Sequence, residues 1–309
     1  NEVFFSDFNL RKPDYFLNAA GGGATETIGK ILIAVDPIME KENPDAVLIL
    51  GDTNSCLCAI PAKKRKIPIF HMEAGNRCFD QRVPEETNRK IVDHTADINL
   101  TYSDIAREYL LREGLPADRV IKTGSPMYEV INSRRADIEN SEVLERLGLE
   151  EGNYFVVSAH REENIDTEKN FLALFGAINK MAEKYNMPIL YSCHPRSKKR
   201  LEQSDFKLDN RVIMHEPLGF YDYNCLQINS FAVVSDSGTL PEESSFFASL
   251  GYAFPAICIR TSTERPEALD KGNFLLAGIE EQSLLQAVEI AVSMNYNKEL
   301  GVPVPDYID

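Results

Sequence analysis

The chain has 309 residues, of which 43% are hydrophobic and 26% are charged, the balance of a folded globular protein. This length exceeds one typical domain core and predicts two domains. The formal net charge of -15 argues against general binding to nucleic acid or to anionic membranes, so we expect neither as a partner. Apolar runs are too short to span a bilayer, no signal peptide opens the sequence, and the six cysteines form no Cys-x-x-Cys pair. We therefore expect free thiols and a cytoplasmic location.

Strand and helix patterns alternate in the first half. Three short apolar stretches are typical of strands: Asp45–Asp52, Lys66–Glu73 and Ala96–Ser103. Apolar residues at helical spacing predict helices over Glu26–Glu42 and Ser103–Gly114, and the second begins at a serine N-cap and ends at a glycine.

The second half repeats this alternation, with a helix predicted over Glu168–Tyr185. Its strand candidates are Tyr154–His160, Met187–His194, Arg211–Glu216, Phe231–Gly238 and Pro255–Thr261. Alternating strands and helices predict an α/β fold with parallel sheets and right-handed crossovers. The polar stretch Asn132–Asn153 has no core strand, so we expect an N-terminal domain of residues 1–135 and a C-terminal domain of residues 136–309.

Polar and ionisable residues follow nearly every predicted strand. In open α/β sheets, ligands bind beyond the carboxyl ends of the strands. The polar strand ends therefore predict one binding site, to which six segments would contribute: residues 51–55, 71–75, 158–163, 194–196, 235–243 and 260–267.

The stretch Val233–Ser245 reads as a buried strand, a tight turn at Asp236–Gly238 and a helix that begins near Pro241. This geometry directs backbone N–H groups and the positive end of the helix toward a phosphate. Glu242 and Glu243 lie one turn further and are suited to accept hydrogen bonds from ribose hydroxyls. The alternative is an ordinary capped helix whose acidic residues complement its dipole.

Cations at neighbouring strand ends fit the same anionic ligand. His160 and Arg161 follow one strand, and their side chains are suited to pair with diphosphate oxygens. The alternative for His160 is a hydrogen bond to a backbone carbonyl. Arg260 and Arg265 lie in the turn after another strand, whereas we expect Lys198–Arg200 to be a solvated face.

Carboxylates gather at the strand ends of the first half, namely Asp52, Glu73, Glu85 and Glu86. Carboxylates that lie close together raise one another's pKa, so that one serves as a base while another serves as an acid. The alternative for each is a surface carboxylate or an ion pair with an arginine of the same stretch: Arg77, Arg82 or Arg89.

Other chemistries find no support in the sequence. No His/Glu spacing is typical of a metal site, and neither a Gly-x-Ser-x-Gly elbow nor a Walker loop is present. The glycines at 21–23 lack the strand and helix that a dinucleotide fingerprint requires. We expect no metal and no cofactor, and we interpret His71 and His94 as structural.

Six motifs in this order resemble the non-hydrolysing UDP-N-acetylglucosamine 2-epimerase family: "GDTNS", "HMEAGNR", "VPEETNR", "SAHREEN", "SDSGTLPEES" and "TERPEALDKG". The resemblance covers essentially the whole chain. It implies two Rossmann-like domains that face each other across a cleft, the GT-B type fold shared with a class of nucleotide-sugar glycosyltransferases. It also implies an isomerase that inverts C2 of a UDP-2-acetamido sugar without NAD or metal, by loss and re-addition of the C2 proton and of UDP. We expect a homodimer.

The resemblance also assigns roles residue by residue. Asp52, Glu73 and Glu85 match the carboxylates of the proton transfers and sugar contacts, and His160 matches a histidine on the phosphate side. The expected substrate-binding residues include Tyr223 on the uracil, Glu243 on the ribose and the diphosphate turn, where Thr239 replaces the usual second glycine. With the two arginines identified above, this set is Arg161, Tyr223, Ser237, Gly238, Thr239, Glu243 and Arg260.

The sequences of these motifs are most similar to those of the capsule and O-antigen branch of the family. This branch converts UDP-2-acetamido-2,6-dideoxy-L-talose to UDP-N-acetyl-L-fucosamine. The N-acetylglucosamine/N-acetylmannosamine epimerases usually have two arginines where this sequence has Arg161-Glu162. We therefore expect the talose substrate. The alternatives are UDP-N-acetylglucosamine/UDP-N-acetylmannosamine epimerisation, a glycosyltransferase of the same fold, and an inactive UDP-sugar-binding homologue.

The start of the sequence departs from the family pattern. Members of the family begin with a strand and a Gly-Thr-Arg-Pro-Glu loop whose arginine reaches the diphosphate. This sequence instead begins with residues typical of the interior of a domain. We expect the first domain to lack its N-terminal strand, with lower activity as a consequence.

Overall fold

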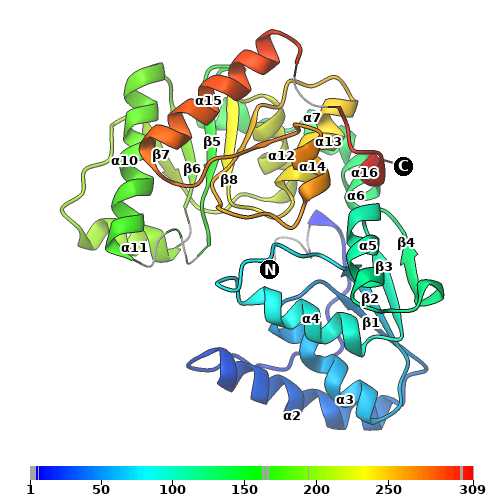
Figure 1. Cartoon of the computed structure of the whole chain (residues 1–309). Helices are drawn as coiled ribbons and strands as arrows, with labels where there is room; N and C mark the ends of the chain where they lie inside the picture. The colour runs from blue at the N-terminus through cyan, green and yellow to red at the C-terminus, as the bar shows by residue number, and fades with distance from the viewer. Residues whose placement is uncertain are drawn as a thin grey trace. The chain divides into compact units, whose positions relative to one another are not determined.

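The computed structural model describes residues 5, 7–161, 164, 167–193, 195–299 and 302–308. These residues form two compact units, coloured along the chain in Figure 1. The N-terminal unit is Arg11–Ser125, and the C-terminal unit is Pro126–Ile308 together with the segment that ends at Leu10. The two units divide at Ser125, earlier than the expected boundary after residue 135, because helix α6 (Met127–Ser133) packs against helix α13 (Leu240–Ser249).

The N-terminal unit is built on a parallel sheet of four strands in the order β1-β2-β3-β4. Its strands are β1 (Val47–Leu50), β2 (Ile69–Ala74), β3 (Ile98–Thr101) and β4 (Val120–Lys122). Its helices are α2 (Ala24–Glu42), η1 (Asn54–Cys58), α3 (Ala59–Lys64), α4 (Glu85–Thr95), α5 (Asp104–Arg112) and η2 (Ala117–Arg119).

Residues on the two faces of this sheet differ in burial. Ile49 and Ile69 are buried in a core that includes residues of α2, η1 and α3. On the opposite face, the side chains of Leu48 and Leu50 are 64% and 63% exposed. Side chains alternate between the two faces of a strand. Among the described residues of β1, the hydrophobic core therefore covers only the face of Ile49.

The C-terminal unit has a parallel sheet of six strands in the order β10-β9-β8-β5-β6-β7. The strands are β5 (Phe155–Ser158), β6 (Ile189–Ser192), β7 (Val212–His215), β8 (Ala232–Ser235), β9 (Ala256–Cys258) and β10 (Leu275–Leu276). Besides α6 and α13, the helices are α7 (Arg135–Glu139), α8 (Val143–Leu147), α10 (Glu168–Tyr185), α11 (Pro195–Gln203), α12 (Phe220–Ile228), α14 (Pro266–Asp270), α15 (Glu281–Tyr296) and α16 (Pro305–Ile308). This strand order is that of a Rossmann fold, and it reverses direction between β5 and β8.

Two hydrophobic clusters cover the two faces of this second sheet. Val157 and Val234 face a cluster formed with α10 and α15, which lie side by side in Figure 1. Val156 and Val233 face the other cluster, to which α6, α7, α8, α12 and α13 contribute. Strands buried on both faces read as continuous apolar runs, which is why these strands were clear in the sequence.

The α/β fold with two Rossmann-like parallel sheets is confirmed, and so are the strands and helices expected in both halves. Helix α4 was not predicted, nor were the short strands β4 and β10. All six cysteines are free thiols. In the described parts of the chain, no helix is both long enough and apolar enough to cross a bilayer.

Candidate active site

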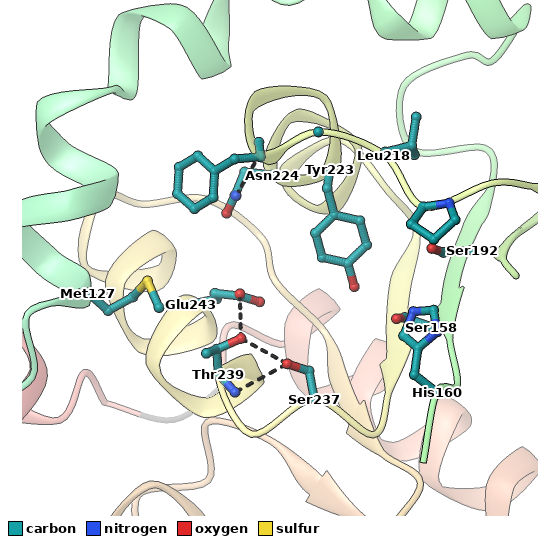
Figure 2. A pocket seen from close by; sticks show the side chains of 13 residues that line it. Met127, Ser158, His160, Ser192, Leu218, Tyr223, Asn224, Ser237, Thr239 and Glu243 are labelled. Atoms are coloured by element: carbon teal, nitrogen blue, oxygen red, sulfur yellow. Dashed lines mark hydrogen bonds between the residues drawn. The ribbon is translucent and has the colours of Figure 1, made fainter. Parts of the chain in front are cut away.

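A pocket of about 350 Å³ opens at the point where the strand order of the C-terminal sheet reverses (Figure 2). Ser158 at the end of β5 and Ser192 at the end of β6 form part of its wall, with His160 just beyond β5. The remaining lining residues come from the start of α6, from α12 and the segment before it, and from α13 and the turn before it: Met127, Pro217, Leu218, Gly219, Phe220, Tyr223, Asn224, Ser237, Thr239 and Glu243. Ligands of open α/β sheets bind at such reversal points.

The turn between β8 and α13 presents hydroxyl groups at the start of the helix. The Ser237 and Thr239 hydroxyls are 2.9 Å apart, and the backbone N–H of Thr239 donates to Ser237 Oγ. Thr239 is the N-cap residue of α13, a helix of ten residues. Hydroxyls and the positive end of a helix dipole together favour phosphate oxygens.

Glu243 lies one turn into α13 and is held by two donors. Its Oε1 accepts from the Thr239 hydroxyl at 2.8 Å, and its Oε2 accepts from Gln227 Nε2 at 2.8 Å. Burial raises the pKa of Glu243, and the hydrogen bonds from Gln227 and Thr239 oppose this rise. The carboxylate is thereby fixed in the wall of the pocket, where a ligand hydroxyl has access to its remaining lone pairs. Glu242, in contrast, pairs with Arg265 at 3.0 Å and does not line the pocket.

Asp236 organises the loop that carries His160. Its buried carboxylate accepts hydrogen bonds from the backbone N–H groups of His160 and Arg161 and from Asn164 Nδ2, at 2.9 to 3.1 Å. Arg161 Nε donates to the backbone carbonyl of Asp236 at 3.2 Å. One carboxylate at the end of β8 thus fixes the loop that follows β5.

Of three other expected binding residues, one lines the pocket, one lies in the turn before α13 and one lies outside the pocket lining. The Tyr223 ring lines the pocket with its hydroxyl directed into it, and burial raises the pKa of this phenol, so it remains a protonated donor (Figure 2). Gly238 lies in the turn with open space around its Cα. Arg260 is buried and pairs with Glu264 at 2.7 and 2.8 Å, outside the pocket lining.

Within the N-terminal unit, the expected catalytic carboxylates lie after β1, within β2 and at the start of α4. Asp52 lies two residues beyond β1 and pairs with Arg89 of α4 at 2.8 Å. Glu73 lies in β2, and its Oε2 lies beside Gly51, where an added Cβ would be 3.2 Å away. Glu85 is the first residue of α4, the helix whose Asn88 side chain donates to the Asp52 carbonyl. Asp52 and Glu73 therefore lie at the junction of β1, β2 and α4, and Glu85 begins the helix of this junction.

The backbone at Glu73 is strained. Its φ is +65°, in the left-handed region that non-glycine residues rarely adopt, and the pairing with β3 shifts register between Met72 and Ala74. Such strain persists only where the surrounding structure enforces it, and it is concentrated at functional sites. Asn76 Nδ2 donates to Glu73 Oε1 at 3.2 Å and holds the carboxylate in this position.

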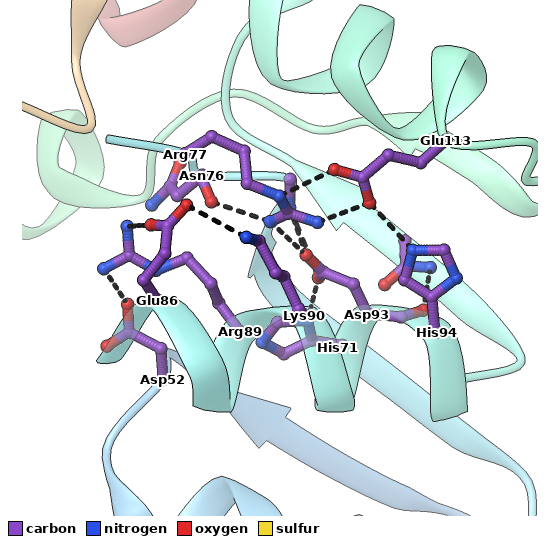
Figure 3. A network of polar contacts seen from close by, with 12 residues as sticks. Asp52, His71, Asn76, Arg77, Glu86, Arg89, Lys90, Asp93, His94 and Glu113 are labelled. Atoms are coloured by element: carbon purple, nitrogen blue, oxygen red, sulfur yellow. Dashed lines mark hydrogen bonds and ion pairs between the residues drawn. The ribbon is translucent and has the colours of Figure 1, made fainter. Parts of the chain in front are cut away.

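A network of ion pairs around the buried residues Arg77 and Asp93 supports this junction (Figure 3). Arg77 is 1% exposed and pairs with Asp93 at 2.7 Å and with Glu113 at 2.8 Å. Burial opposes ionisation of Glu113, but the hydrogen bonds from Arg77 and His94 outweigh it and lower the pKa of this carboxyl. Within the described residues, no group of three or more metal-ligating side chains is placed to hold a metal ion.

Comparison with known proteins identifies the family. Residues 1–307 match the profile of the family Epimerase_2, described as UDP-N-acetylglucosamine 2-epimerase. The chain belongs to this family. Its members named UDP-N-acetylglucosamine 2-epimerase are non-hydrolysing epimerases, a class of isomerases.

Solved structures of epimerases match the whole fold. A UDP-N-acetylglucosamine 2-epimerase from Rickettsia bellii is 46% identical, with a TM-score of 0.90 over 99% of this chain and 81% of that one. The Methanocaldococcus jannaschii UDP-GlcNAc 2-epimerase, solved in complex with UDP-GlcNAc and UDP, is 32% identical, with a TM-score of 0.90 over 100% of this chain and 85% of that one. A UDP-2,3-diacetamido-2,3-dideoxy-D-glucuronate 2-epimerase from Pseudomonas aeruginosa is 30% identical over 94% of this chain and 80% of its own length.

Several residues that hold the expected site residues of this epimerase-family chain in place were not predicted from the sequence. Asp236 was visible in the "SDSG" motif without an assigned role, and Gln227 and Asn76 gave no signal of their own contacts. The ion pair that the sequence offered as an alternative is present at Asp52, whose partner is Arg89. The catalytic and binding roles of the expected residues stay predictions.

Proposed function

We propose that the chain interconverts UDP-N-acetylglucosamine and UDP-N-acetylmannosamine by inversion at C2. The observation that supports the proposal is the junction of β1, β2 and α4, to which Asp52, Glu73 and Glu85 belong. Glycosyl transfer to an acceptor does not need three carboxylates, whereas inversion of a carbon centre requires proton transfer on both of its faces.

We assign nucleotide binding to the pocket of the C-terminal unit. The hydroxyls of Ser237 and Thr239 and the start of α13 fit a diphosphate, and Glu243 fits the ribose hydroxyls. His160, which also lines this pocket, is suited to pair with phosphate oxygens when it is protonated. The Tyr223 ring supplies an apolar wall for the uracil.

The proposed reaction needs only groups of the substrate and of this chain. One carboxylate accepts the proton of C2 while the bond between C1 and the phosphate oxygen breaks, and UDP leaves with the bonding electron pair. A double bond forms between C1 and C2, which gives a 2-acetamidoglycal. A second acid then returns a proton to the opposite face of C2, and UDP re-forms its bond to C1. General acid–base catalysis of this kind contributes about 10²–10⁴-fold.

The choice of sugar rests on the relatives. Two of the matching structures are of enzymes named for UDP-N-acetylglucosamine, and the third relative is named for a different UDP-2-acetamido sugar. The talose substrate expected from the motif sequences is the second candidate. Residues 162 and 163, which belong to one of these motifs, lie outside the described residues. The homodimer and the cytoplasmic location likewise stay predictions.

A time course of ¹H NMR in D₂O with a single UDP-sugar and no acceptor tests the proposal. We expect UDP-N-acetylglucosamine to give UDP-N-acetylmannosamine with deuterium at C2, because the proton returns from solvent-exchangeable groups. Faster conversion of UDP-2-acetamido-2,6-dideoxy-L-talose would reassign the substrate. Turnover only after an acceptor is added would favour a glycosyltransferase, and UDP binding without turnover of any sugar would favour an inactive homologue.

A further inference from the structure

His71 of β2 is a buried group that the proposed chemistry does not use. Its side chain is 0% exposed. Its Nδ1 lies 2.8 Å from Asp93 Oδ1, and its Nε2 lies 3.0 Å from the carbonyl oxygen of Gly51. The ring therefore spans the gap between helix α4 and the end of β1.

Both contacts of this ring are hydrogen-bond acceptors. A neutral imidazole has one N–H and one lone pair, so either tautomer would direct a lone pair at an oxygen atom. Asp93 is not available as a neutral donor, because its carboxylate already accepts from Arg77 Nη1 at 2.7 Å and from the backbone N–H of Gly75. Only the imidazolium, with two N–H groups, satisfies both partners.

The charges around the ring agree with this protonation state. Asp93 of α4 is buried, Glu113 just after α5 is partly exposed, and Arg77 pairs with both. From β3, Asn99 contributes only a neutral amide, which donates to the Asp93 carbonyl. A positive His71 places a second cation beside Asp93, whereas Glu113, whose side chain is 29% exposed, pairs with Arg77 and with His94.

The same contacts connect the backbones on either side of the carboxylate junction. Gly51, which accepts from His71, immediately precedes Asp52. Glu73 lies two residues after His71, in its strained conformation, and Gly75 beyond it donates to Asp93. The ring and Asp93 thus hold the segment before Asp52 and the segments on both sides of Glu73.

We propose that His71 is a positioning residue, an imidazolium that donates to Gly51 and Asp93 and thereby fixes the separation of the Asp52 and Glu73 carboxylates. This role rests on the proposed epimerase function. A misplacement of catalytic groups by about 1 Å costs on the order of 10²-fold in rate.

Two substitutions each remove one half of this bridge. In His71→Asn the amide nitrogen takes the place of Nδ1 and keeps the bond to Asp93, and in His71→Gln it takes the place of Nε2 and keeps the bond to Gly51. We expect both variants to lose about 10²-fold in kcat, with KM changed by less than about threefold. His94→Gln is the matched control, because His94 lies on α4 and contacts Glu113 from the exposed side. We expect it to retain kcat.

Two further measurements on the full chain do not depend on turnover. With ¹⁵N-labelled histidine, a long-range ¹H–¹⁵N correlation at neutral pH should show protons on both ring nitrogens for one of the five histidines, and that signal should be absent in His71→Asn. Amide hydrogen exchange in segments 48–55 and 72–78 should be faster in both His71 variants than in His94→Gln.

One unprotonated ring nitrogen on His71, unchanged exchange in these segments, or wild-type kcat in either His71 variant would overturn the proposal. A wild-type chain that converts no UDP-sugar would overturn the proposed function instead. The NMR and exchange results would then still decide whether His71 bridges the two strand ends as an imidazolium.

Discussion

The polar side chains at the strand ends are held by different interactions in the two units. In the C-terminal unit the pocket is lined mainly by hydroxyls, apolar side chains and one carboxylate, Glu243, that accepts hydrogen bonds from neutral donors. In the N-terminal unit, ionised side chains are held by opposite charges, as in the pairs Arg89–Asp52 and Arg77–Asp93. The sheet below the pocket is covered on both faces, whereas β1 next to the carboxylates is covered on one.

This difference matches the two tasks that we propose. A chain with a net charge of -15 binds a diphosphate only where local dipoles outweigh the overall repulsion, and oriented hydroxyls and a helix N-terminus do so without a buried cation. Proton transfer instead requires carboxylates at defined positions, which the ion pair with Arg89 gives to Asp52 and the hydrogen bond from Asn76 gives to Glu73. Each prediction below disturbs one of the two units.

The largest effect is expected from removal of the carboxylates of the N-terminal unit. Asp52→Asn, Glu73→Gln and Glu85→Gln should each lower kcat by at least about 100-fold, because each removes a group that donates or accepts a proton. The affinity for UDP, measured by calorimetry, should stay within about twofold of wild type, since the nucleotide is held by the other unit.

Glu108→Gln is the control for these variants, because Glu108 forms an exposed pair with Arg112 on α5 of the same unit. It should retain both kcat and UDP affinity. Equal loss of kcat and of UDP affinity in the three carboxylate variants would show that the two tasks are not divided between the units.

The converse change, Glu243→Ala, should act on binding. It removes a charged acceptor and leaves Gln227 Nε2 without its partner, so UDP binding should weaken by about 1–3 kcal/mol, roughly 5–150-fold. At saturating substrate, kcat should fall far less than in the carboxylate variants. Glu183→Ala, an exposed position on α10 of the same unit, is the control. Unchanged UDP affinity in calorimetry would remove Glu243 from the site.

The sequence revealed the C-terminal sheet and its pocket more completely than the N-terminal network, for a physical reason. Strands buried on both faces are continuous apolar runs, and the motif residues follow them directly. Helix α4 was missed because its buried face is largely polar and therefore shows no apolar periodicity. The buried residues of this helix are Glu86, Asn88, Arg89, Val92 and Asp93.

Pairings between distant residues also left no trace in the sequence. His71 and Asp93 lie 22 residues apart, and Asp236 contacts a loop 72 to 76 residues before it. Strands β4 and β10 are three and two residues long, too short for an alternating pattern to be recognised. Contacts of this kind depend on the sheet order, which single-sequence patterns do not specify.

A smaller effect is expected from Asp236→Asn, which disturbs the loop of the C-terminal pocket. The carboxylate accepts from two backbone N–H groups and from Asn164, and an amide replaces one acceptor oxygen with a donor. We expect UDP affinity to fall by about tenfold, which corresponds to about 1.4 kcal/mol, because His160 and Arg161 lose their fixed positions. Ser249→Ala at the far end of α13 is the control. Unaltered UDP binding in calorimetry would show that this loop does not contact the nucleotide.

The smallest effect concerns the stability of the N-terminal network and its dependence on pH. The hydrogen bonds from Arg77 and His94 lower the pKa of Glu113 below its ordinary value of 4.5, although burial opposes this. A carboxyl whose pKa is lowered by folding binds fewer protons when folded, so its contribution to stability is present above pH 4.5 and is lost as the pH falls through the lowered pKa.

Glu113→Gln should therefore lower Tm at pH 7 by about 2–4 °C, equivalent to about 1 kcal/mol. The difference from wild type should disappear as the pH falls below the lowered pKa, and UDP affinity at pH 7 should be unchanged. A Tm difference that stays constant from pH 7 to strongly acidic pH in scanning calorimetry would show that Glu113 stabilises this unit by packing rather than by its charge.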